Sequence, residues 1–123
     1  MDTRSKILTC EAVCDLPRPL AVATGYFDVL VAGHARDLEC VRKRTGAPLL
    51  VAVRPMPGAV LSPRARAELV AALRVVDYVV IADDEELDTL IDRLRPAGLA
   101  HLERAGASRT RQLREHVRSR QIR

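Results

Sequence analysis

Three short runs of apolar residues divide the first two thirds of the chain. They lie at residues 20–24 (Leu-Ala-Val-Ala-Thr), 49–53 (Leu-Leu-Val-Ala-Val) and 78–81 (Tyr-Val-Val-Ile). The runs are rich in Val and Leu and show no alternation of apolar and polar positions. Such runs are typical of strands buried on both faces, so the pattern predicts three strands of a parallel sheet.

Segments with helical spacing alternate with these runs, at residues 33–44, 63–74 and 83–95. The last is the clearest, because Leu87, Leu90, Ile91 and Leu94 follow the spacing of one helix face. The acidic residues 83–86 fill its first turn, where the helix dipole favours them, so they indicate a helix start rather than a metal site. Ser62 and Pro63 provide an N-cap and a first position for the middle helix.

The alternation of strands and helices predicts an α/β fold in which helices cover a parallel sheet. Residues 97–107 are ambiguous between a fourth strand and a helical turn, and residues 108–120 predict a final helix capped by Ser108. We expect one domain over residues 1–123. Its parts are a lead-in (1–18), a core (19–96), and a short connection followed by a basic helix (97–123).

The net charge of +4 is unevenly distributed, because residues 101–123 hold seven Arg and two Glu while the rest of the chain is close to neutral. Aromatic residues make up only 2% of the chain, which argues against a surface that stacks nucleobases. No apolar run approaches a membrane span, and the charged N-terminus is unlike a signal peptide. The three cysteines form no zinc-binding set, so we expect reduced, inert thiols in a cytoplasmic protein.

The strongest chemical signal follows the first predicted strand, over residues 24–34 (Thr-Gly-Tyr-Phe-Asp-Val-Leu-Val-Ala-Gly-His). A strand runs into a glycine-containing loop, and the loop runs into a helix that starts near Gly33. The backbone N–H groups and dipole of such a helix start favour an anion. The arrangement therefore predicts a phosphate site.

This segment resembles the Gly-x-Phe-Asp-x-Leu-His-x-Gly-His motif of the cytidylyltransferase-like nucleotidyltransferases. The matching residues are Gly25, Phe27, Asp28, Leu30, Gly33 and His34. Further likeness at residues 5–9, 66–80 and 90–96 is closest to heptose 1-phosphate adenylyltransferase and glycerol-3-phosphate cytidylyltransferase domains. The resemblance covers residues 5–96 and implies a three-layer, Rossmann-like nucleotidyltransferase fold.

The resemblance also implies the transfer of a nucleoside monophosphate from ATP or CTP to a sugar- or polyol-phosphate, with release of pyrophosphate. Mg²⁺ accompanies the nucleotide in such enzymes, and no tightly bound cofactor or protein metal site is implied. His34 would be the catalytic residue. The residues expected to bind nucleotide or phosphate are Gly25, Tyr26, Phe27, Asp28, Gly33, His34, Arg66, Ser108, Thr110 and Arg111.

The chain departs from the family pattern at three places. Val31 stands where the motif has its first histidine, Arg54-Pro55-Met56-Pro57-Gly58 replaces a longer basic loop, and residues 97–106 are too few for two further strands. We therefore expect a sheet of three or four strands with the first long strand at its edge. The C-terminal helix, residues 97–105 or a second subunit would cover that edge, and on this ground we predict a homodimer. Three functions stay open: a nucleotidyltransferase, a non-catalytic nucleotide- or phosphate-binding module, and a module that binds nucleic acid or an acidic partner through the arginine-rich helix.

Overall fold

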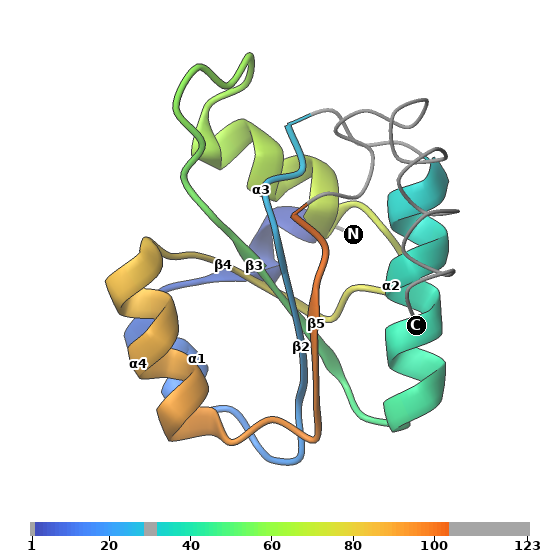
Figure 1. Cartoon of the computed structure of the whole chain (residues 1–123). Helices are drawn as coiled ribbons and strands as arrows, with labels where there is room; N and C mark the ends of the chain where they lie inside the picture. The colour runs from blue at the N-terminus through green and yellow to red at the C-terminus, as the bar shows by residue number, and fades with distance from the viewer. Residues whose placement is uncertain (1, 29–31, 104–123) are drawn as a thin grey trace, which may run out of the picture.

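The computed structural model describes residues 2–28 and 32–103 as one parallel sheet with helices on both faces (Figure 1). The five strands have the order β1-β4-β3-β2-β5. Their bounds are β1 Ile7–Leu8, β2 Ala21–Gly25, β3 Leu49–Val53, β4 Tyr78–Ile81 and β5 Gly98–His101. All pairings are parallel, which confirms the predicted α/β class.

Alternate side chains of the central strands supply the two halves of the core. On one face, Leu49, Val51 and Val53 of β3 pack with residues of α2 (Ala32–Thr45) and α3 (Pro63–Ala71). On the other face, Leu50 and Ala52 pack with α1 (Cys10–Cys14) and α4 (Asp84–Leu94). A 3-10 helix, η1 (Thr3–Lys6), precedes β1. Because helices cover both faces of the sheet, β2 and β3 are buried at every position, which explains why their sequences do not alternate between apolar and polar residues.

The predicted elements and caps of the core are confirmed. β3 and β4 have the expected bounds, and the three expected helices lie within three residues of theirs. The Ser62 hydroxyl accepts a hydrogen bond from the N–H of Ala65, with Pro63 opening α3. Asp83 and Glu86 form a reciprocal capping box at the start of α4, so the acidic run is a helix start.

The predicted number of strands was wrong: the sheet has five, not three or four. β1 has only two residues, which pair with Val79 and Val80, and such a short run carries no periodic signal. β5 occupies the ambiguous segment and pairs with the whole of β2 except its last residue. α1 was also missed, since its five residues are too few to show a helical period.

β2 is consequently an interior strand between β3 and β5 and not an exposed edge. Of the three covers expected for it, residues 97–105 supply the one that is observed, through β5. Among the described residues, the edge on this side is β5, where Leu99 is 42% exposed. The predicted homodimer rested on an exposed β2, so it loses that argument and stays an untested prediction. The expected helix at 108–120 lies outside the described residues, and no helix within 2–28 and 32–103 is long and apolar enough to cross a membrane.

Candidate functional site

The strand order reverses at β2, because β3 and β4 follow on one side of it and β5 lies on the other. In open parallel sheets, ligands bind beyond the carboxyl ends of the strands at such a reversal. The loops that meet there begin at Tyr26, Arg54, Ala82 and Leu102. The loop between β3 and α3 extends past this end of the sheet, at the top of Figure 1.

The glycine at the end of β2 makes room for an aromatic ring. A Cβ atom on Gly25 would lie 2.7 Å from two carbons of the Phe27 ring. Phe27 is buried and adopts a left-handed backbone conformation with φ of 53°. This conformation turns the chain back so that the ring covers Gly25, which explains why the motif needs glycine here.

Phe27 also contacts His34, the predicted catalytic residue. The two rings meet edge to face with centroids 5.3 Å apart. His34 lies in the first turn of α2 directly after Gly33, and both residues are buried. The structure therefore brings Gly25, Phe27, Gly33 and His34 together at the carboxyl end of β2. Their role in binding nucleotide stays a prediction.

Asp28, predicted to bind nucleotide or phosphate, ties two loops together. Its two carboxylate oxygens each accept a backbone hydrogen bond of 2.9 Å, one from Val60 and one from Leu61. These hydrogen bonds, that of Leu61 first, lower the pKa of the Asp28 carboxyl group below its ordinary value. Asp28 thereby fixes the loop after β3 against the loop after β2.

Arg66, also predicted to bind nucleotide, lies inside the protein with 1% of its surface exposed. Its Nη1 donates to the backbone oxygens of Tyr26 at 2.8 Å and Arg54 at 2.7 Å. Its Nε has no hydrogen-bond partner among the described residues. A hollow of about 460 Å³ lies between this arginine and residues 55–63. Arg66 thus joins the same two loops as Asp28, through the backbone oxygens of Tyr26 and Arg54.

A polar network that the sequence did not predict crosses the carboxyl ends of β2, β3 and β5. Thr24 donates to Glu103 Oε2 at 2.5 Å and lies 2.9 Å from Nδ1 of His101. Arg54 donates through Nη1 to the same Glu103 oxygen at 3.0 Å. These residues come from three strands or their ends, so the network connects the strands that flank the reversal point.

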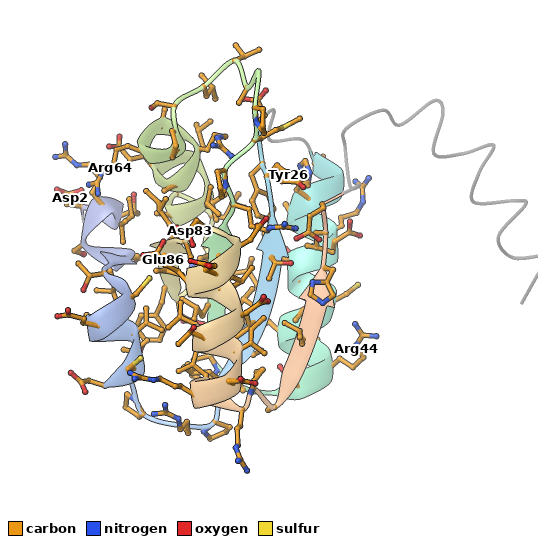
Figure 2. All side chains as sticks on the ribbon, turned by 60° about the vertical axis from the view of Figure 1, so that its left-hand side comes forward. Asp2, Tyr26, Arg44, Arg64, Asp83 and Glu86 are labelled. Atoms are coloured by element: carbon orange, nitrogen blue, oxygen red, sulfur yellow. The ribbon has the colours of Figure 1, made fainter. Side chains whose placement is uncertain are left out.

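Arg54 also reaches α4 and the first loop. Its Nε and Nη2 donate to Asp84 Oδ1 at 3.1 and 2.7 Å, and its guanidinium lies 5.3 Å from the centre of the Tyr26 ring. Figure 2 shows Tyr26 near this end of the sheet, and Asp83 and Glu86 beside each other at the start of α4. Tyr26, a predicted binding residue, therefore supports Arg54 with its ring face.

The electrostatics of this network favour its charged form. The pKa of Arg54 is raised, chiefly by the hydrogen bond to Asp84 and further by that to Glu103, against the effect of burial. For Glu103, burial raises the pKa, but hydrogen bonds from Thr24, from its own backbone and from Arg54 outweigh burial and lower it. Glu103 is accordingly an anion paired with a cation at neutral pH.

The sequence offered weak signals for this network. From the sequence, Arg54 was either a phosphate contact or a solvated loop arginine, Asp84 was part of a helix start, and His101 and Glu103 were part of an ambiguous segment. Ser108, Thr110 and Arg111, predicted to contact phosphate, lie outside the described residues. Across residues 2–28 and 32–103, no group of three or more His, Cys, Asp or Glu side chains is arranged to hold a metal ion.

Comparison with known proteins identifies relatives, although no family model matches the chain. The bifunctional protein HldE of Bradyrhizobium diazoefficiens is 41% identical over 83 residues, which are 61% of this chain and 17% of that protein. The FAD synthase of Ferroglobus placidus is 33% identical over 64% of this chain and 55% of its own length. The D-beta-D-heptose 1-phosphate adenylyltransferase of Bordetella bronchiseptica is 33% identical over 76% of this chain and 64% of its own. The chain thus spans less than two thirds of the length of each of these relatives.

A solved structure supports the fold. The lipopolysaccharide core biosynthesis protein of Thermoplasma volcanium matches 63% of this chain and 69% of its own with a TM-score of 0.57 and 24% identity. That likeness concerns the fold alone, while the curated relatives share sequence over 61–76% of the chain. The parallel sheet, the motif residues Gly25, Phe27, Gly33 and His34 at its reversal point, and the sequence shared with these relatives together support assignment to the cytidylyltransferase-like nucleotidyltransferase family.

Proposed function

We propose that this domain binds ATP or CTP at the carboxyl ends of β2 and β3 and transfers the nucleoside monophosphate to a sugar- or polyol-phosphate. The observation that carries the proposal is the cluster of Gly25, Phe27, Gly33 and His34 at the point where the strand order reverses. The name of the Bordetella relative, a heptose 1-phosphate adenylyltransferase, supports ATP as donor and a sugar phosphate as acceptor.

In the proposed reaction, an oxygen of the acceptor phosphate attacks the α-phosphorus of the nucleotide, and the bond to pyrophosphate breaks. The protein supplies position and charge stabilisation rather than a covalent intermediate. His34, in the first turn of α2, would donate a hydrogen bond to the phosphates, and the dipole of this 14-residue helix adds positive potential there. Mg²⁺ would accompany the triphosphate, bound mainly by phosphate oxygens and water.

Val31 favours a second candidate, a domain that binds the nucleotide without efficient turnover. Valine offers no hydrogen bond and no charge where the family motif has its first histidine. Loss of one preorganised donor typically costs about 10²–10³ in rate. The two candidates share the ligand and differ in turnover, so one substitution can separate them.

The test is Val31→His, with Val31→Ala as the control for a change of size at the same position. Pyrophosphate release is measured with ATP or CTP, Mg²⁺ and a heptose phosphate or glycerol phosphate. We expect Val31→His to raise the rate by about 10²-fold and Val31→Ala to leave it unchanged. His34→Asn in the Val31→His background should abolish the gain.

Thermal shift with ATP, CTP and AMP measures binding independently of turnover, since a ligand at 100 times its Kd stabilises by about 2.7 kcal/mol. Binding without pyrophosphate release in either Val31 variant would favour the non-catalytic candidate. Absence of any shift at millimolar nucleotide would refute both.

A further inference from the structure

Arg54 directly follows β3 and lies across the reversal point, between two carboxylates. Glu103 follows β5 on one side, and Asp84 opens α4 on the other. One guanidinium therefore faces two carboxylates at the end of the sheet where a phosphorylated ligand would bind. Two carboxylates against one guanidinium leave an excess of negative charge, which is unusual for a site that binds phosphate. The two carboxylates differ in burial and in their other contacts.

The contact with Glu103 is the firm one. The Glu103 side chain is 16% exposed, and its Oε2 also accepts the Thr24 hydroxyl hydrogen bond. The Tyr26 ring lies along the guanidinium at 5.3 Å. Besides Asp84, the Arg54 side chain thus contacts Glu103, which follows β5 and is itself held by Thr24 of β2, and the Tyr26 ring of the first loop.

The ion pair between Arg54 and Asp84 is exposed, so another anion can replace Asp84 in it. The Asp84 side chain is 72% exposed, and exposed ion pairs contribute little to stability because water and salt compete for both partners. Asp84 Oδ1 accepts from both Nε and Nη2. This edge of the guanidinium is one that carboxylates and phosphates recognise with paired hydrogen bonds.

We propose that Asp84 is an internal competitor which occupies the anion-binding edge of Arg54, and that a ligand phosphate takes its place there. Glu103 and Tyr26 keep Arg54 oriented during the exchange, so they are positioning residues. The identification of the phosphate as part of a nucleotide or of pyrophosphate rests on the proposed function. The exchange itself depends only on the geometry of Arg54, Asp84 and Glu103.

The experiment measures the Kd of pyrophosphate and of ATP by titration calorimetry at low salt, using the full chain. The variants are Asp84→Asn, the double variant Arg54→Ala/Asp84→Asn, and Asp88→Asn. Asp88 is exposed on the same helix and gives the same change of net charge one turn further on. A urea unfolding curve for each variant verifies that it is folded.

We expect Asp84→Asn to lower the Kd of pyrophosphate by about threefold to tenfold, which corresponds to releasing one exposed ion pair and removing one nearby negative charge. Asp88→Asn should change it by less than a factor of about two. The double variant Arg54→Ala/Asp84→Asn should not show this decrease in the Kd of pyrophosphate. An unchanged Kd in Asp84→Asn, or equal gains in Asp84→Asn and Asp88→Asn, would overturn the inference.

Failure of the proposed function gives a different result. If pyrophosphate binds more tightly to Asp84→Asn while ATP shows no binding and no turnover in any variant, Arg54 is an anion site and the nucleotide assignment is wrong. If ATP binds and turns over but Asp84→Asn has no effect, the function stands and the inference falls.

Discussion

Gly25→Ala offers the most direct check on the geometry of the site. The new methyl group would lie 2.7 Å from Cε2 and Cζ of Phe27, whereas ordinary van der Waals contact begins at 3.4 Å. The ring must therefore retreat by about 0.7 Å, the difference between these two distances. Phe27 is 2% exposed and packs on His34, so the ring cannot move outward without disturbing that contact.

The cost follows from this crowding. Inserting a methyl group into a packed core costs about 1–3 kcal/mol of unfolding free energy. Replacement of glycine by alanine restricts the unfolded chain and returns about 0.4–1 kcal/mol, since Gly25 does not occupy the left-handed region. We therefore expect a net destabilisation of about 0.5–2 kcal/mol, a sizeable part of the 5–15 kcal/mol that holds a domain of this size.

The assay is urea unfolding of wild type, Gly25→Ala, Phe27→Leu and the double variant. Leucine lacks the ring carbons that Cβ would meet, so the methyl group should cost at least ~0.5 kcal/mol less in the Phe27→Leu background. Nucleotide affinity, read by thermal shift, should fall in Gly25→Ala because the displaced ring moves His34. If the changes in unfolding free energy of Gly25→Ala and Phe27→Leu simply add in the double variant, the claim that Gly25 makes room for the Phe27 ring is refuted.

Three further predictions concern polar contacts that stabilise the fold, at the site and at the opposite end of β3. Arg66→Met should destabilise by about 2–4 kcal/mol, because the backbone oxygens of Tyr26 and Arg54 lose their buried donor; a urea-measured loss under 1 kcal/mol would contradict this role. Asp77→Ala should cost about 1–3 kcal/mol, since Asp77 accepts from the Leu49 N–H at 2.8 Å and pairs with Arg42, whereas the exposed control Asp88→Ala should stay within about 0.5 kcal/mol. Acid should weaken the fold as pH falls from about 5 to 3. The lowered pKa values of Asp28 and Glu103 give stability that is present above the unfolded-state values near 4 and is lost as pH falls through the folded-state ones. The urea midpoint of Asp28→Asn should depend less on pH than that of wild type, and identical pH profiles would argue against Asp28 as a contributor.

The core of the fold could be predicted from sequence because its signals are local. The run Leu49–Val53 is apolar at every position, so burial on both faces and the strand bounds follow directly. Ser62 and Asp83 lie next to the helical turns that they cap, and Ser and Asp are residue types that indicate a helix start. In each case, the residues that carry the signal lie within one element.

The parts of the fold and of the site that the sequence did not predict depend on contacts between segments far apart in the chain. The strand β5 has only half-buried and exposed positions, and it is a strand because β2 offers it hydrogen bonds across 77 residues of sequence. The Arg54 contacts join residues 30 and 49 positions apart, and Thr24 reaches Glu103 across 79. Nothing local to Arg54 distinguishes a clamped arginine from a solvated one, so its role required the structure.

The motif residues serve two purposes, and this limits what their presence says about catalysis. Asp28 uses both carboxylate oxygens on the backbone of the loop after β3, and Arg66 uses Nη1 on the carbonyls of both loops. Gly25 makes room for Phe27, which packs against His34. A chain needs these residues to build the end of the sheet, whether or not it transfers a nucleotide. Most of the motif therefore reports the fold, and the Val31→His variant tests whether the replaced histidine limits turnover.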